Sequence, residues 1–356
     1  MFYLKNIQLT NFRCYKNKIF DFKEGKNIII GNNAVGKTSL VEAIHCLCFG
    51  KSFRDVKDGE LINFNEDYFL IKSIFSGEND YRINLSYDKN TKIINNNDKK
   101  HNSISDYLGF FNLIVFSPDD LELVKGNPNI RRRFLDINIS QYDKIYLKSL
   151  IKFKKILKER NELLKNDDPS EIDHTLLAVL TTAFIEQATI VINKRKQFID
   201  DLNYILRDKV NQLSLGTEDV QIVYKPKNNV DNLWKTYEER KSFDILNRTT
   251  TWGPTRDEFL IYLNNKEATS FCSQGQIRTI TIAIKLALVE LFEKYNDKII
   301  IILDDVFSEL DVHRQNQLVE MLDSRKQTFI TTTSIDSLSK EVINNSNIIE
   351  IVGGLT

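Results

Sequence analysis

The chain has 356 residues, 42% of them hydrophobic and 28% charged, and its formal net charge at pH 7 is zero. This length is enough for a large core and predicts two lobes, and the balanced charge means that any basic surface for nucleic acid must be local. The sequence shows neither a signal pattern nor an apolar run approaching the roughly 18 residues of a membrane span, so we expect a cytoplasmic protein that contacts no membrane.

The first 116 residues show the pattern of short strands with one helix. Apolar and polar residues alternate in stretches such as 81–85, which is typical of half-buried strands, and the turn segments GEND and DKNT flank them. Residues 27–30 form a short apolar strand that leads into a glycine-bracketed loop and then a helix. We therefore expect this part of the chain to be rich in β-structure.

From residue 117 to about residue 209 the apolar residues recur at three- and four-residue steps, which indicates helices. The two longest predicted helices cover 145–165 and 176–206, and the segment KNDDPS at 165–170 breaks the pattern between them. Two helices joined in this way would form an antiparallel arm roughly 30–45 Å long.

β-Structure returns after the polar stretch 211–242. The run KIIIILDD at 298–305 is a buried strand of the kind that parallel sheets use, and weaker strands are predicted at 327–333 and 348–352. The sequence thus predicts an α/β fold. Residues 1–116 and 243–356 would form a head, and residues 117–242 would form an inserted helical lobe that carries the arm.

The loop after the first predicted parallel strand matches the Walker A pattern. Two glycines bracket four residues and are followed by lysine and threonine, so that backbone N–H groups can face inward and cradle phosphates. Lys37 would reach the β- and γ-phosphates, and Thr38 would offer its hydroxyl to Mg²⁺. The predicted ATP-binding residues are Gly31, Asn32, Asn33, Ala34, Val35, Gly36, Lys37, Thr38 and Ser39.

An acidic pair stands at the end of the predicted strand 298–305. Asp304 would hold Mg²⁺, directly or through water, and Asp305 would act as the catalytic carboxylate that orients or deprotonates the attacking water. Two aspartates that merely cap a helix are the alternative. Ser308 and Asp311, in the segment SELD that follows, are expected to form a D-loop.

A second helix start, SQGQIRT at 273–279, has the features of an anion site. Ser273 is a good N-cap for the apolar helix that follows, and an ordinary capped core helix is the alternative. Since Walker A already supplies a phosphate cradle, Ser273, Gln274, Gly275 and Gln276 are predicted to meet the γ-phosphate of a nucleotide bound to another subunit. That arrangement is typical of a P-loop ATPase head of the ABC type, in which two chains sandwich two ATP molecules.

In this order the motifs closely resemble the RecF family, which is related to the heads of SMC proteins. The resemblance runs essentially from end to end, and its most specific part is FSPDDLELVKGNPNIRRRFLD at 116–136. The other matching segments are LKNIQLTNFRCY, GNNAVGKTSLVEAI, GKSFR, SQGQIRT, LDDVFSELD and TFITTTS. The segment GPTRDEF at 253–259 departs from the family at Thr255, where histidine is usual, which leaves the role of this loop open.

The resemblance implies ATP and Mg²⁺ as cofactors, an ATP-dependent homodimer, and binding to double-stranded DNA and to single/double-strand junctions. It further implies RecO and RecR as partners in loading RecA, with slow ATP hydrolysis that promotes release from DNA. By resemblance to related heads, Arg13 is a candidate nucleotide contact. A convincing Q-loop glutamine and a histidine after 327–333, both usual in transporter ATPases, are missing, so a transporter component is not expected.

A basic stripe on the first arm helix is a candidate DNA contact. Eight basic residues stand between 144 and 165 against two acidic ones, and several recur at three- and four-residue steps that share a helix face. Such a stripe can follow a phosphate backbone without reading sequence, although a solvated helix face is the simpler interpretation. The predicted DNA contacts are Lys144, Lys148, Lys152 and Lys155.

Two other functions use related heads. A nuclease of the overcoming-lysogeny type needs a metal-dependent catalytic domain, and only about 45 residues follow SELD. An SMC-like structural ATPase needs arms of hundreds of residues. The sequence therefore favours a DNA-repair ATPase that acts as a clamp or mediator on DNA.

Overall fold

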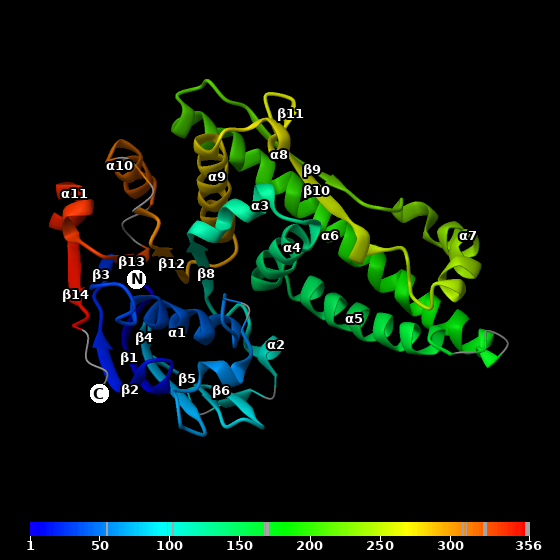
Figure 1. Cartoon of the computed structure of the whole chain (residues 1–356), viewed down its shortest axis with the longest axis horizontal. Helices are drawn as coiled ribbons and strands as arrows, with labels where there is room; N and C mark the ends of the chain where they lie inside the picture. Colours follow the sequence, from blue (N-terminus) through cyan, green and yellow to red (C-terminus); the bar gives the residue numbers. More distant parts are fainter. Residues whose placement is uncertain are drawn as a thin grey trace. The chain divides into compact units, whose positions relative to one another are not determined.

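The computed structural model describes residues 1–352 except 55, 98, 102, 167, 169, 170, 308, 309, 311 and 323–325. The chain forms two compact units: unit 1 comprises Met1–Asp120 and Lys285–Thr356, and unit 2 comprises Leu121–Ile284 (Figure 1). The first boundary lies close to the predicted one. The second boundary, 284/285, differs from the predicted 242/243, because residues 258–263 pair with residues 220–225 of unit 2. The residues that follow, up to Ile284, also belong to unit 2.

Unit 1 contains two sheets. The antiparallel sheet has six strands in the order β2-β1-β4-β5-β6-β7, with β1 Tyr3–Phe12, β2 Tyr15–Asp21, β4 Phe69–Ser76, β5 Tyr81–Tyr87, β6 Lys92–Asn96 and β7 Lys99–His101. The parallel sheet has five strands in the order β14-β3-β13-β12-β8, with β3 Lys26–Ile30, β8 Asn112–Phe116, β12 Ile299–Asp304, β13 Gln327–Thr332 and β14 Ser346–Glu350. The predicted strands at 81–85, 298–305, 327–333 and 348–352 therefore form, with slightly different ends.

Helix α1, Lys37–Phe49, contacts strands of both sheets of unit 1. Its residues are buried almost all round, as expected of a helix that is covered on two sides. Because β3 leads directly into the loop that precedes α1, the packing of this helix fixes the position of the predicted Walker A residues. The other helices of unit 1 are α2 Ile104–Tyr107, α10 Val312–Met321 and α11 Lys340–Asn344.

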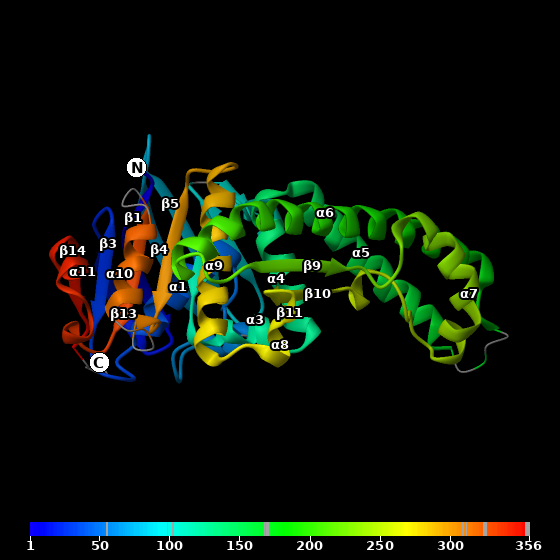
Figure 2. The ribbon, with the colours of Figure 1, turned by 90° about the horizontal axis from the view of Figure 1, so that it is seen from above.

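Unit 2 is the predicted helical lobe with a small sheet added. Its long helices are α5, Lys144–Leu164, and α6, His174–Ser214. They are antiparallel: Arg160, near the end of α5, forms a hydrogen bond with Thr181 near the start of α6, and Tyr146, near the start of α5, forms one with Arg195 further along α6. Strands β9 Val220–Lys225, β10 Glu258–Leu263 and β11 Lys266–Glu267 form a three-stranded sheet, and Figure 2 shows β9 running along α6. The remaining helices are α3 Glu122–Lys125, α4 Pro128–Tyr142, α7 Leu233–Leu246 and α8 Ala268–Phe271. Helix α9, Gln274–Glu293, begins in unit 2 and ends in unit 1.

Helix α6 differs from its prediction in two ways. Its 41 residues correspond to about 60 Å, longer than the predicted arm, because the sequence offers no helix breaker before Leu215 and Gly216, which both have positive φ. It also contains an 18-residue window with a mean hydropathy of 1.8, so the prediction that no apolar run approaches the length of a membrane span was wrong. Packing accounts for part of this apolar content: 39% of the window is buried, including Phe184, Val191 and Ile192.

Two buried arginines hold the arm helices to the rest of unit 2. On α6, the Arg195 guanidinium donates to Asp136 Oδ1 (2.8 Å) and to the carbonyl of Pro254 (2.8 Å). This second bond gives the loop 253–259 a structural role, as does the fully buried Asp257, which accepts from the backbone N–H of Lys227. On α5, Arg160 pairs with Asp244 of α7, and neither side chain is exposed.

Candidate nucleotide-binding site

The loop between β3 and α1 has the backbone that its glycines allow. Gly36 has a φ of 113°, and a Cβ atom at this position would lie 2.6 Å from the Tyr15 hydroxyl oxygen and 2.7 Å from Cys14 Sγ. A Cβ atom on Gly31 would lie 2.5 Å from the carbonyl oxygen of Ile351. Both positions therefore require glycine: Gly36 because of its positive φ and its close neighbours, and Gly31 because a side chain would have no space.

Lys37, the first residue of α1, reaches back across this loop. Its Nζ donates to the carbonyl oxygens of Gly31 (2.7 Å) and Asn32 (2.8 Å). Burial lowers the pKa of the Lys37 ammonium, and the charges of Asp305 and Asp304 act in the opposite direction. An ammonium group has three donors, so it can hold the loop and a phosphate oxygen at the same time.

The two predicted carboxylates lie at the end of β12, next to the loop. Asp304 is buried, and its Oδ1 accepts from the hydroxyls of Thr331 (2.8 Å) and Thr38 (3.4 Å). Burial raises the pKa of the Asp304 carboxyl, while the hydrogen bond from Thr331 and the charge of Arg54 oppose this rise. Asp305 is exposed and has a φ of 55°, in the left-handed region.

The oxygens of Thr38 and Asp304 fit a Mg²⁺ ion. Magnesium in nucleotide sites is bound by hydroxyl and carboxylate oxygens together with phosphate oxygens and water. Within the described part of the chain, no group of three or more His, Cys, Asp or Glu side chains is placed to hold a metal without such help. Thr38 and Asp304 would each supply one oxygen, and the phosphates of a bound nucleotide would supply others.

A cavity of about 220 Å³ opens beside the loop. Of the predicted residues, Asn33, Ala34, Gly36, Lys37, Thr38, Ser39 and Asp305 line it. Gly31, Asn32 and Val35 belong to the loop but are not among the described residues at the cavity wall. Three other lining residues were not predicted as site residues from the sequence: Cys14, Arg54 and Thr331. Arg54 and Thr331 belong to the segments GKSFR and TFITTTS, but nothing in their spacing distinguishes them from their neighbours.

Arg13 is not among the described residues that line this cavity, and its contact to a nucleotide stays a prediction. Its guanidinium instead donates to both carboxylate oxygens of Glu42 on α1, at 2.8 and 2.7 Å, and to the carbonyl of Glu60 at 2.9 Å. The hydrogen bond to Glu42 raises the pKa of Arg13 in spite of partial burial. Since Glu42 is fully buried, the pair joins the end of β1 to α1.

The segment predicted to act on another subunit begins α9. The backbone N–H of Gln276 donates to Ser273 Oγ (3.3 Å), and the backbone N–H of Ser273 donates to Gln276 Oε1 (3.0 Å), a reciprocal capping box. The Gln276 amide also donates to Glu218 (3.1 Å), while Ser273 and Gln274 are exposed. Ser273 therefore caps its own helix, and its action in trans stays a prediction. The D-loop candidates Ser308 and Asp311 lie outside the described residues.

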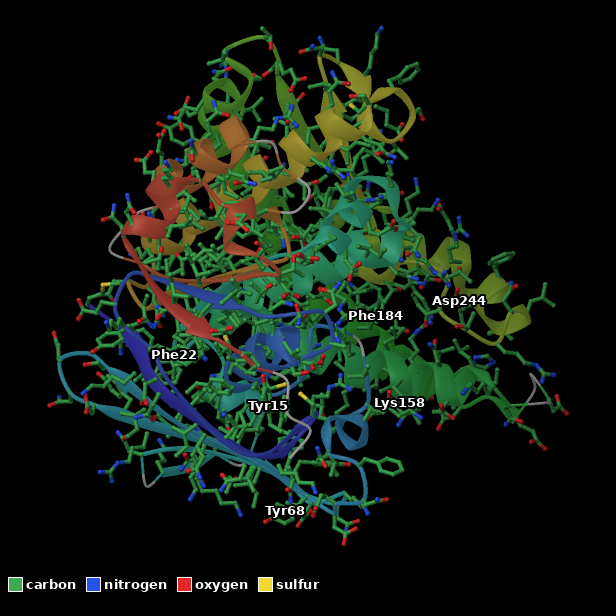
Figure 3. The ribbon with its side chains drawn as sticks, turned by 60° about the vertical axis from the view of Figure 1, so that its left-hand side comes forward. Tyr15, Phe22, Tyr68, Lys158, Phe184 and Asp244 are labelled. Atoms are coloured by element: carbon green, nitrogen blue, oxygen red, sulfur yellow. The ribbon has the colours of Figure 1, made fainter. Side chains whose placement is uncertain are left out.

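The basic stripe lies on α5 of unit 2. Lys144, Lys148, Lys152 and Lys155 are exposed, and Lys155 forms a long ion pair with Glu159 (3.8 Å). Lys158 is exposed as well (Figure 3). The eight basic residues counted in this segment do not all belong to the stripe, because Arg160 is fully buried in its pair with Asp244.

Comparison with known protein families and curated sequences gives a consistent result. The family model described as RecF/RecN/SMC N terminal domain matches residues 3–352. The DNA replication and repair protein RecF of Bacillus thuringiensis (strain Al Hakam) is 36% identical over 365 residues, covering 99% of this chain and 97% of that protein. RecF of Bacillus cereus (strain AH187) matches with the same values.

Solved structures give the same result for the fold. A structure of the recombination mediator protein RecF with ATP, in the RecFOR pathway, superposes with a TM-score of 0.88 at 34% identity, covering 94% of this chain and 92% of that one. RecF-ATPrS superposes equally well at 32% identity, covering 95% and 94%. An Smc head domain from Pyrococcus furiosus gives a TM-score of 0.55 at 16% identity, covering 98% and 93%, which shows a shared fold alone.

Proposed function

Because the chain belongs to the RecF family, we propose that it binds ATP in the cavity beside Lys37 and acts in DNA repair and replication as a recombination mediator. ATP binding would drive the formation of a homodimer on DNA near single-strand gaps. There the dimer would help to load RecA together with RecO and RecR in the cytoplasm, and slow hydrolysis would release it. The observation that carries this proposal is the cavity formed by the loop after β3, with Asp305 and Thr331 in its wall.

The side chains around the cavity have the chemistry that phosphate binding and transfer need. The loop N–H groups and Lys37 would neutralise the phosphate oxygens, and Thr38 and Asp304 would hold Mg²⁺. When bound, Mg²⁺ would offset the charge of the β- and γ-phosphates. Asp305 is exposed at the cavity wall, where its carboxylate would orient or deprotonate the attacking water.

The lysine stripe of α5 is the proposed DNA contact. Lysines one helical turn apart present their charges to the same side, which suits a phosphate backbone and requires no base contact. For the dimer we propose that Ser273 and Gln276 complete the nucleotide site of the partner. Neither alternative function is favoured: the Smc match shows fold alone, and the RecF proteins match over nearly the whole chain.

ATP-dependent retention on gapped DNA tests this function, with Lys37→Ala to remove the phosphate contact. We expect this variant to lose nucleotide affinity and with it the ATP-dependent part of DNA retention. A variant with Lys148, Lys152 and Lys155 changed to glutamate should bind ATP normally. Its log–log dependence of DNA affinity on salt should be less steep by up to about 2.7 units, for three lost phosphate contacts.

The matched control carries the same charge change on unit 1, with exposed Lys16, Lys18 and Lys99 changed to glutamate. If both triple variants alter the salt dependence equally, net charge and not the α5 stripe governs DNA binding. Wild-type nucleotide affinity in Lys37→Ala would refute the nucleotide site.

A further inference from the structure

Thr331 occupies a position that connects the two carboxylates of the site. It lies on β13, between β3 and β12 of the parallel sheet, in register with Asp304 on one side and with Ile29 on the other. The residue is almost completely buried, yet it also contributes to the cavity wall. A buried hydroxyl at such a place needs hydrogen-bond partners, and their identity decides what it does.

Both hydrogen bonds of the Thr331 hydroxyl go to the acidic pair. The hydroxyl donates to Asp304 Oδ1 (2.8 Å) and accepts from the backbone N–H of Asp305 (3.0 Å). The bond from Thr331 to Asp304 is shorter than the one from Thr38 (3.4 Å), so Thr331 contributes more to the orientation of this carboxylate. A hydroxyl has one proton, and Thr331 donates it to Asp304. It can therefore only accept from the backbone N–H of Asp305, so the donor and the acceptor of both hydrogen bonds are fixed.

The bond to Asp305 matters because of the conformation of that residue. With a φ of 55°, Asp305 is held in a region that residues other than glycine seldom adopt, and such a conformation persists only when neighbouring contacts determine it. The contact to Thr331 restrains the peptide that joins Asp304 to Asp305. The Thr331 hydroxyl thus fixes both the Asp304 carboxylate at the end of β12 and the backbone turn that places the Asp305 carboxylate at the cavity.

We propose that Thr331 is a positioning residue for both carboxylates: it aims Asp304 at Thr38 for cation binding and holds Asp305 at the cavity for hydrolysis. This inference rests on the proposed nucleotide site. It separates two parts of that site, because the described hydrogen bonds of the Lys37 ammonium go to the carbonyls of Gly31 and Asn32, whereas those of the Thr331 hydroxyl go to the acidic pair. Binding of the phosphates by the loop should not need the Thr331 hydroxyl, whereas the gain in affinity from Mg²⁺ and the hydrolysis step should.

The neighbouring Thr332 provides a matched control. It lies on the same strand and is also buried, but its hydroxyl donates to the carbonyl of Ser334 (3.0 Å). Consecutive residues of a strand point to opposite faces, and Thr332 is not among the described residues that line the cavity. Thr331→Val and Thr332→Val therefore remove the same hydroxyl from adjacent positions, and Thr331→Ser restores it.

The experiment measures the Kd of a fluorescent ATP analogue in EDTA and in Mg²⁺, and the single-turnover hydrolysis rate. In EDTA, we expect the Kd of Thr331→Val for the ATP analogue to lie within about twofold of the parent value. The gain in nucleotide affinity on adding Mg²⁺ and the hydrolysis rate should each fall by about 10–100-fold, as they do when residues that orient metal ligands are replaced. Thr331→Ser should recover most of both losses, and Thr332→Val should match the parent.

The other outcomes overturn the proposal in different ways. If Thr331→Val keeps the full gain in nucleotide affinity from Mg²⁺, the Thr331 hydroxyl has only a structural role in the sheet and does not orient the carboxylates. Lost affinity in EDTA would show that Thr331 supports the whole loop and not the carboxylates in particular. If the parent itself binds no nucleotide, the proposed function fails and this inference fails with it, whereas parent-like behaviour of Thr331→Val beside a defective Lys37→Ala refutes the inference alone.

Discussion

The buried pair of Arg160 and Asp244 should dominate the stability of unit 2. Arg160 Nη2 lies 2.9 Å from Asp244 Oδ2, and the guanidinium carbon lies 6.0 Å from the centre of the Phe184 ring and 5.8 Å from that of Trp252. Asp244 also accepts from Trp252 Nε1 (2.9 Å) and from the backbone and hydroxyl of Thr251 (2.9 and 2.7 Å). We predict that Asp244→Asn, which keeps the shape and removes the charge, destabilises unit 2 strongly.

The size of this effect follows from what the substitution leaves behind. Burial already lowers the pKa of Arg160, and Asp244 is the charge that opposes this, so the variant retains a buried guanidinium without its carboxylate. Removing one partner of a buried ion pair costs about 3–5 kcal/mol. For a unit of 164 residues (121–284), each kcal/mol corresponds to roughly 2–4 °C, so we expect the melting temperature to fall by roughly 6–20 °C.

Tryptophan fluorescence is the natural assay. The chain has two tryptophans, Trp234 and Trp252, and both belong to unit 2, so the emission reports this unit alone. Trp252 is fully buried and Trp234 is exposed, so a Trp234→Phe background isolates the buried signal. Glu239→Gln, which breaks an exposed pair with Lys235, is the control and should change little. A melting temperature within about 2 °C of the parent in Asp244→Asn would refute the reasoning.

Two further predictions concern pH and subunit contacts. Burial alone would raise the pKa of Asp136, but the charges of Arg195 and Lys154 and the hydrogen bonds from Arg195 and Tyr146 hold it below its ordinary value. The Asp136 carboxylate thus stabilises the fold at pH values above its unfolded pKa of about 3.9, and this contribution is lost as the pH falls through its folded pKa. The difference in urea midpoint between the parent and Asp136→Asn should therefore shrink from pH 6 to pH 3. A difference that stays constant over this range would contradict the prediction. Ser273→Arg should lose a cap worth about 1 kcal/mol and keep monomeric ATP binding, but fail to dimerise on ATP. Mixing it with Lys37→Ala should recover activity, and normal dimerisation of Ser273→Arg alone would exclude action in trans.

The sequence predicts the conformation of the loop between β3 and α1 well because its requirements are local. Gly36 needs a positive φ, Lys37 and Thr38 follow it directly, and the apolar run before Asp304 can only be a buried strand. Each of these properties is visible within a few residues, and so is the helical period of α5 and α6. The same local reading predicts that Ser273 caps its helix, which the capping box with Gln276 confirms.

What the sequence could not predict depends on partners that are distant in the chain. Arg160 fits the basic stripe by its spacing, but Asp244, 84 positions later, makes it a buried residue. The resemblance names Arg13 as a candidate nucleotide contact, but nothing in the sequence shows that its guanidinium donates to Glu42 and to the carbonyl of Glu60. Thr331 is one of three consecutive threonines, and only the register of β13 with β12 shows which of them meets Asp304. The weakly periodic stretch 211–242 likewise concealed β9 and α7, whose partners lie elsewhere.

The strand order of the parallel sheet sets the time at which the proposed nucleotide site can form during synthesis. Strand β3, which leads into the phosphate loop, pairs only with β13 and β14 among the described strands, and both lie roughly 300 residues further along. At about 5–20 residues per second, a ribosome needs roughly 15–60 s to make the intervening chain. Unit 2 is contiguous and complete by then, so it can fold while unit 1 still waits for its last strands. The nascent chain should therefore acquire its arm before it can hold ATP, and it could not dimerise on nucleotide until translation is nearly finished.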